Sequence, residues 1–138
     1  MSRVCLVFAS AAVAAGVGTS VASAGVRVVH ASPDAPNVDV FVNGTPGVNP
    51  PAITNLPFRS ATGYVPLATG NYNFKVTPAG LTAPVLIDVN QPIDGAQDYS
   101  VVAINFLSSI SALPLVDDNT INPAAARVRF VHAAPDVP

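Results

Sequence analysis

Cysteine is almost absent from this sequence. The 138 residues include one, Cys5, and it lies inside an N-terminal apolar run that we expect to be removed. A mature chain without thiols has no disulfide, no zinc–cysteine site and no cysteine nucleophile. The fold must then be held by its apolar core alone.

Charged residues are also scarce. They make up 10% of the chain, against about 25% in ordinary soluble domains. Six basic and eight acidic residues give a formal net charge of −2, and no basic stripe stands out. Neither nucleic acid nor an anionic membrane surface is therefore an expected partner. A surface covered by Asn, Thr, Ser and Pro instead suits an exported β protein.

The first 24 residues have the features of a secretory signal peptide. One positive charge, Arg3, precedes an apolar run from Val4 to Val17, and Ala22-Ser23-Ala24 fits the small-x-small rule of signal peptidase. The run is shorter than the about 20 apolar residues of a membrane span, so an uncleaved anchor is the less favoured alternative. We predict cleavage before Gly25, a secreted, periplasmic or cell-surface location, and no membrane span in the mature chain.

Sustained helical periodicity is missing from the rest of the chain. Fourteen prolines and nine glycines divide the sequence into short runs rich in Val, Ile, Phe and Tyr. The mature chain, residues 25–138, has the length of one domain. Turn spacings of about 8 to 12 residues predict an all-β fold, an immunoglobulin-like antiparallel β-sandwich of about seven strands. The predicted strands cover residues 26–31, 37–42, 59–67, 72–77, 84–90, 98–106 and 109–116.

Some runs allow more specific predictions. The valines of residues 37–42 alternate, so they share one face, and the following Asn43-Gly44 predicts a tight hairpin turn. Tyr72 shares a face with Phe74 and Val76, and it follows Gly70 at a spacing that predicts a tyrosine hydroxyl capping a neighbouring loop. Residues 98–106 are apolar on both faces, which predicts the most central strand.

An eleven-residue stretch occurs twice. Residues 26–36, VRVVHASPDAP, align without gaps to residues 128–138, VRFVHAAPDVP, with eight identities. The offset of 102 residues is the length of a whole sandwich domain and exceeds the repeat of a solenoid. We therefore predict a sandwich domain at 25–118, a linker at 119–126 and the start of a second repeat at 127–138. That repeat breaks off after its first strand, so the gene is truncated or the sequence is a fragment of a longer tandem protein.

The repeated motif and two later stretches resemble a known family. VRVVHASPDAPNVDVFVNG, GYVPLATGNYNFKVTPAG and LPLVDDN are similar to the secreted modules grouped as domain of unknown function 4397, over essentially Val26 to Asn119. The resemblance implies a β-sandwich module, often repeated in tandem, on exported or surface proteins. It implies no reaction, because the family has none assigned and no catalytic residues to carry over.

The motif contains the residue types of several kinds of site. Ser32, His30 and an Asp (Asp34 or Asp39) could form a nucleophilic triad, but Ser32 precedes a proline in a turn and the second copy has Ala134 in its place. A metal site built on the histidine and the two carboxylates is another alternative, weakened by the lack of a second nearby histidine. We favour a structural role in which the His30 ring bonds the turn and locks the loop. The residues assigned to this motif role are His30, Ser32, Pro33, Asp34, Pro36, Asp39, His132 and Asp136.

Two other groups of residues could bind a ligand. Asp117-Asp118-Asn119 offers three oxygen ligands at the end of the domain, where calcium could stiffen a tandem array, although EF-hand spacing is absent. A solvated turn is the favoured interpretation there. Tyr64, Tyr72 and Phe41 could stack on a sugar if they shared a face, but core packing is favoured. No cofactor is expected.

Two classes of function stay open from the sequence. The favoured one is a non-enzymatic exported module with a structural, adhesive or cell-envelope interaction role and an unidentified protein or envelope partner. The alternative is a glycan- or calcium-binding module that uses loops at one end of the sandwich. Because Val128 to Ala133 nearly duplicates Val26 to Ala31, we also expect it to compete for the same strand position, or to fill that position in a neighbour and cause self-association.

Overall fold

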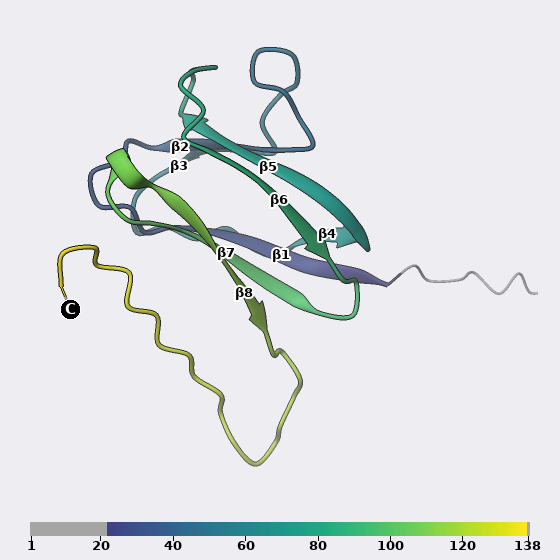
Figure 1. Cartoon of the computed structure of the whole chain (residues 1–138). Helices are drawn as coiled ribbons and strands as arrows, with labels where there is room; N and C mark the ends of the chain where they lie inside the picture. Colours follow the sequence, from purple (N-terminus) through teal and green to yellow (C-terminus); the bar gives the residue numbers. More distant parts are fainter. Residues whose placement is uncertain (1–21, 138) are drawn as a thin grey trace, which may run out of the picture.

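The computed structural model describes residues 22–137, in which two four-stranded sheets pack face to face (Figure 1). The predicted β-sandwich is therefore confirmed. Cys5 and most of the predicted signal peptide lie outside the described residues. The strands are β1 (Ser23–His30), β2 (Val38–Val42), β3 (Ile53–Leu56), β4 (Val65–Ala68), β5 (Gly70–Pro78), β6 (Ile87–Ile93), β7 (Asp98–Ile104) and β8 (Ser111–Asp117), with a 3₁₀ helix, η1 (Leu107–Ser109), between the last two.

One pair of neighbouring strands is parallel, whereas the sequence predicted an antiparallel sandwich. Sheet A has the order β4-β1-β7-β8 and sheet B the order β3-β2-β5-β6. All neighbours are antiparallel except β1 and β7, which run parallel with Val26 opposite Tyr99. Parallel neighbours need a crossover rather than a hairpin, and here the chain passes through all of sheet B before β7 returns beside β1. The sequence could not show this arrangement, because it depends on strands far apart in the chain.

One strand prediction and one turn prediction need correction, and one strand was not predicted. The predicted strand at 59–67 overlaps only the short β4 at its end, because Arg59 has a positive φ of 66° and the chain crosses between the sheets there. The predicted tight turn at Asn43-Gly44 is wrong as well. Asn43 does have a left-handed backbone, with φ of 51°, but the connection from β2 to β3 is a long loop. β3 is additional to the seven predicted strands, because it lies between the predicted strands at 37–42 and 59–67.

The inner faces of the two sheets form the core. The valines of β2 predicted to share a face do so, with Val38 and Val40 each 1% exposed, and Phe74 and Val76 of β5 pack beside them. The predicted central strand, β7, is an inner strand of sheet A and is buried on both faces. The hydroxyl of Tyr72 donates to the Ala68 carbonyl oxygen at 3.0 Å, as predicted for a loop-capping tyrosine.

The outer faces of the sheets differ in polarity. On sheet B, Asn73 and Lys75 of β5 contact Asp88 of β6. The Asn73 hydrogen bond, and after it the hydrogen bond and charge of Lys75, lower the pKa of this carboxyl. On sheet A, the outward residues at the centre are apolar instead and include Val29 and Val102, the latter 6% exposed. An apolar outer face needs something to cover it.

We expect Val40→Ala to lower the free energy of unfolding by about 2 kcal/mol, because it removes two methyl groups from a packed site and leaves a cavity. Urea unfolding of the purified protein measures this as a lower midpoint at an unchanged slope. Val48→Ala is the matched control, since Val48 is 78% exposed. Equal midpoints for the two variants would contradict the placement of the core.

Candidate functional site

His30 closes the motif turn from inside the protein. It ends β1 and is 0% exposed. Its Nε2 lies 3.0 Å from the carbonyl oxygen of Pro36, and its Nδ1 accepts a 3.4 Å hydrogen bond from the amide of Ser32. A neutral ring with its hydrogen on Nε2 satisfies both contacts. The ring of Phe58 packs edge-on at 6.0 Å between centroids, so the imidazole is held on several sides.

Ser32 is not arranged as a nucleophile. Its side chain is 0% exposed, and its Oγ has no hydrogen-bond partner among the described residues. A serine nucleophile needs a hydrogen bond to its base and access for a substrate. The contact between Ser32 and His30 joins a backbone amide to the ring instead. The structure therefore does not assemble the triad that the residue types allow.

The two carboxylates of the motif contact separate loops. Asp34 accepts a 2.7 Å hydrogen bond from the amide of Leu107, the first residue of η1. Asp39 is 7% exposed and accepts 2.8 Å hydrogen bonds from the amides of Asn55 and Gly80. Both donors have positive φ, 53° and 76°, so this one carboxylate holds a left-handed residue within β3 and another in the turn after β5. His30, Asp34 and Asp39 do not converge on a common point.

The exposed residues of the motif shape the turn. Pro33 and Pro36 are exposed and flank Asp34, and the Pro36 carbonyl is the acceptor for His30. The counterparts His132 and Asp136 in the second copy are exposed as well. The histidine of the motif is thus buried in the first copy and exposed to solvent in the second.

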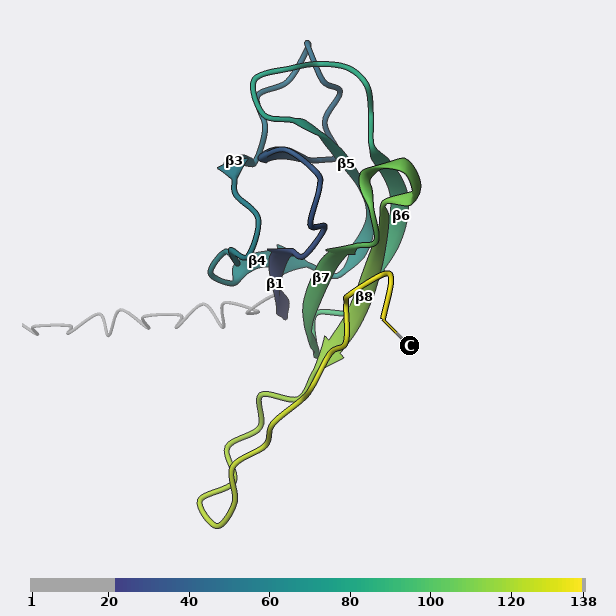
Figure 2. The same ribbon diagram turned by 90° about the vertical axis from the view of Figure 1, so that its left-hand side faces the viewer.

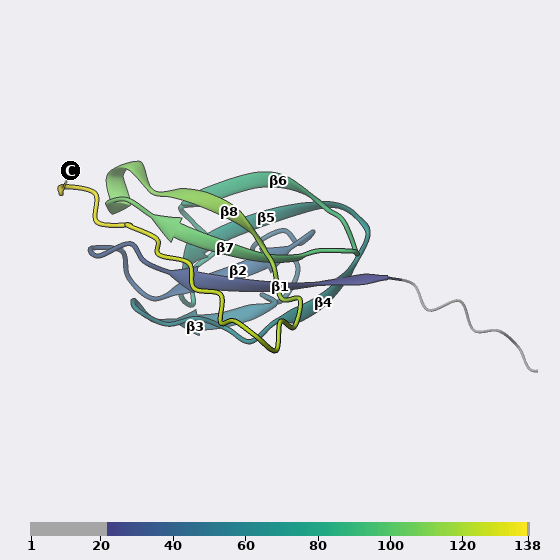
Figure 3. The same cartoon turned by 90° about the horizontal axis from the view of Figure 1, so that it is seen from below.

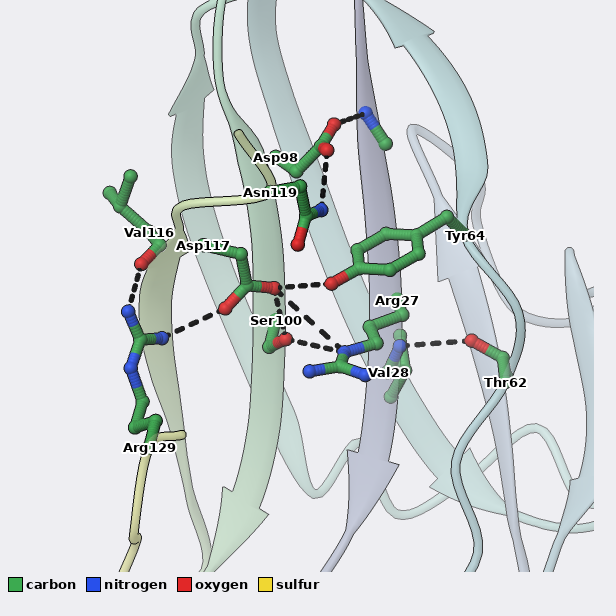
Figure 4. A network of polar contacts seen from close by, with 11 residues as sticks. Arg27, Val28, Thr62, Tyr64, Asp98, Ser100, Val116, Asp117, Asn119 and Arg129 are labelled. Atoms are coloured by element: carbon green, nitrogen blue, oxygen red, sulfur yellow. Dashed lines mark hydrogen bonds and ion pairs between the residues drawn. The ribbon is translucent and has the colours of Figure 1, made fainter. Parts of the chain in front are cut away.

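A second polar centre lies on the outer face of sheet A (Figure 4). Asp117, at the end of β8, accepts hydrogen bonds from the Tyr64 hydroxyl, at 2.8 Å, and from the Ser100 hydroxyl through its Oδ2. Arg27 Nε lies 3.8 Å from the same oxygen. The other oxygen, Oδ1, accepts a 2.8 Å hydrogen bond from Arg129. The Asp117 side chain is 9% exposed.

The same network positions Arg27 tightly. Its Nε donates to the Ser100 hydroxyl at 2.6 Å, and its guanidinium lies 5.0 Å from the centre of the Tyr64 ring, a cation–π geometry. Sequence reasoning missed this cluster because its members come from different strands. The available signal was that Arg27 recurs in the second copy as Arg129.

The three oxygen-bearing residues considered as calcium ligands, Asp117, Asp118 and Asn119, contact different partners. Asp117 belongs to the network above. Asp118 accepts from the hydroxyl and amide of Thr120, and these bonds, together with the charge of Arg127, lower the pKa of its carboxyl. Asn119 donates to Asp98 at 2.6 Å. Within residues 22–137, no group of three His, Cys, Asp or Glu side chains is placed to hold a metal ion.

The three aromatic residues considered for sugar stacking do not share a face. Phe41 is 3% exposed beneath the loop that contains Val48. Tyr72 packs on Phe74 with 6.5 Å between centroids, and Tyr64 lies over sheet A beside Arg27. No stacking platform is formed by these residues.

The fold and the buried motif define a small β-sandwich module whose most distinctive residues hold its own loops. Over residues 24–138 the sequence matches the family described as Domain of unknown function (DUF4397), and the chain belongs to that family. The match includes the second copy of the motif. No curated protein and no solved structure matches the chain. In the described part of the chain, no helix has the length and apolarity needed to cross a membrane.

We expect His30→Ala to lower the free energy of unfolding by about 3 kcal/mol, because it leaves a cavity and removes the ring from the Pro36 carbonyl and the Ser32 amide. The measurement is urea unfolding at neutral pH. His132→Ala is a control from the same motif and should leave the midpoint unchanged, because that ring is exposed. A His30→Ala protein as stable as the control would show that the contacts of the His30 ring with Pro36 and Ser32 contribute little to the stability of the fold.

We expect Asp39→Asn to lower the free energy of unfolding by about 2 kcal/mol, since one carboxylate oxygen that accepts a backbone amide is replaced by an NH₂ group that cannot. Thermal unfolding measures the loss. Asp136→Asn, on an exposed residue of the second copy, makes the same chemical change without that contact. Similar midpoints in both variants would show that the hydrogen bonds from the Asn55 and Gly80 amides to Asp39 contribute little stability.

Proposed function

We propose that this protein is a non-enzymatic, exported structural module that presents its surfaces to a protein or cell-envelope partner. One observation carries the proposal: His30, Asp34 and Asp39 each bond the backbone of a connection between strands. Reactive or ligating side chains need free lone pairs and access to a substrate. Here the imidazole and the carboxylates are used to hold the ends of the sandwich.

Export is supported by the sequence of the leader and by the position of Gly25. Cleavage before Gly25 would remove Ser23 and Ala24 from β1 and create an amino group at Gly25. The Gly25 nitrogen lies 2.6 Å from Asp98 Oδ1, so the new charge would form an ion pair there. A Cβ at residue 25 would lie 2.8 Å from the same oxygen, which favours glycine at this end of the mature chain.

A second candidate function, calcium or glycan binding by loops at one end, is favoured by a single feature. A hollow of about 510 Å³ opens beside the end of β8, and Asp98, Asp118 and Asn119 are among its lining residues. Its oxygen atoms suit a hard cation or sugar hydroxyls. We rank it second because Asp98 and Asn119 already bond each other across it.

Three measurements on the full-length gene product test the proposal. We expect export from the producing cell, an intact mass equal to residues 25–138, and the same thermal midpoint in calcium as in EDTA. Retention in the cytoplasm with the leader attached would contradict the exported role. A midpoint that rises with calcium concentration would favour the second candidate, because a ligand that binds the folded state stabilises it.

The non-enzymatic part has a separate test with a fluorophosphonate probe, which labels activated serine nucleophiles. We expect no labelling of the folded protein, because Ser32 is buried and its hydroxyl has no base. Ser32→Ala should keep or slightly raise stability, since it removes a buried hydroxyl without a partner. Labelling that disappears in Ser32→Ala would overturn the proposal.

A further inference from the structure

The second copy of the motif lies across the outer face of sheet A. Figures 1 and 3 show residues 127–137 running back along the sheet after a turn beyond its end. This segment, the docking segment, forms no strand, and within the described residues it makes no backbone hydrogen bond to the sheet. The expected competition for the β1 position is therefore not seen within one molecule. Contact is made by side chains alone.

The two copies of the motif face each other across a groove of about 250 Å³. One wall carries Arg27 and Val29 of β1 and Ala31 just after it, and the other carries their counterparts Arg129, Val131 and Ala133. The floor is the outward side of β7 and β8, including Val102 and Leu115. An Arg-x-Val-x-Ala face thus packs on sheet A beside the identical face of β1.

Asp117 gives this contact its specificity. Its Oδ2 is used within the domain by Tyr64 and Ser100, whereas its Oδ1 accepts from Arg129 of the docking segment, as Figure 4 shows. Arg129 also donates to the carbonyl oxygen of Val116. The sheet therefore offers a carboxylate and a carbonyl to one arginine from outside, which is a geometry that guanidinium groups recognise well.

The opposite side of the docking segment is uncovered. Val128 and Phe130 are 73% and 93% exposed, while their counterparts in β1, Val26 and Val28, are 4% and 7% exposed. A strand face that is core in the first copy is presented to water in the second. Apolar side chains exposed on one strand favour association with another protein surface.

The connection that keeps the docking segment on its own sheet is weakly held. Figure 2 shows the chain leaving β8, turning and returning as a narrow excursion away from the sandwich. Arg127 bonds Asp118 and Thr120 at its neck, and all three side chains are exposed. Exposed ion pairs contribute little stability. Opening the excursion breaks few contacts, and every side-chain contact of the segment can be remade on another chain.

We propose that the outer face of sheet A is the docking surface for residues 127–137 of a second copy of this chain. Arg129 of one copy pairs with Asp117 of the other, and the valine and alanine beside it fill the groove. Exchange of an identical segment between copies costs little, because the same contacts form in both arrangements. This inference rests on the proposed structural role and names its partner.

The experiment uses disulfide trapping between two chains in a background in which Cys5 is replaced by Ser. One chain carries Val29→Cys on the sheet and an affinity tag, and the other carries Val131→Cys on the docking segment. Both positions line the same groove. We expect oxidation of the mixture to give a mixed disulfide-linked pair. The control replaces Val131→Cys with Val137→Cys, a residue that is 55% exposed and does not line the groove.

Light scattering of the full chain over a concentration series supplies a second readout. We expect the mass to rise toward that of a dimer, and Arg129→Ala to raise the dissociation constant about tenfold, as expected for the loss of a charge-assisted contact. Deletion of residues 121–125 should strengthen association, because the shortened connection prevents the segment from reaching its own sheet. Arg129 lies outside the strands, so its substitution leaves the sandwich core intact.

Equal trapping of Val131→Cys and Val137→Cys, or a shortened chain that stays monomeric, would overturn the docking proposal. Either result would leave the structural role standing if the exported protein behaves as expected in the calcium and probe experiments. Failure of the structural role is detected separately, by retention of the chain in the cytoplasm or by labelling of Ser32. The two proposals can thus fail independently.

Discussion

Contact between the valine-rich inner faces of the two sheets is the interaction on which this module depends. The described residues, 22–137, include no cysteine to cross-link them and few charges to pair. Val38 and Val40 of β2 and Val26 of β1 are almost completely buried in that contact. Branched side chains suit it because they lose little conformational freedom when a strand forms. The polar residues of the motif add hydrogen bonds that hold the connections at the ends of this core.

Polar groups buried at the margins of this core are acceptable because they are hydrogen-bonded. His30 and Thr77 are both 0% exposed, and each contacts a carbonyl oxygen, of Pro36 and of Leu81 respectively. Asp39 accepts from two amides. The His30 bond fixes the connection from β1 in sheet A to β2 in sheet B, whereas the Thr77 bond and the Gly80 bond of Asp39 fix the connection between β5 and β6 within sheet B. Side chains that resemble catalytic groups thus hold connections between strands. The buried hydroxyl of Ser32 is the exception among them.

The sequence predicted local features well, namely which face of an individual strand is buried. Alternation along residues 37–42 and 72–77 identified the buried faces of β2 and β5, because a strand places every second side chain on one side. β3 was missed, since four residues between prolines carry too little pattern. The strand predicted at 59–67 failed because the His30 carbonyl accepts from the Arg59 amide, at 2.9 Å, and holds that residue in a left-handed conformation. The Asp117 network could not be predicted from the sequence, because its residues meet only through the order of β1, β7 and β8 in sheet A.

The parallel pairing of β1 with β7 also determines when the protein can fold. Gly25 and Asp98, at the start of this pair, are 73 residues apart in the chain. During synthesis from the N-terminus, β1 cannot pair with β7 until most of the domain has been made. Pairings between strands so far apart in the chain also form slowly. A nascent chain that stays unfolded for this long remains able to pass through a narrow channel. Folding of the sandwich is completed only after β7 and β8 have been synthesised.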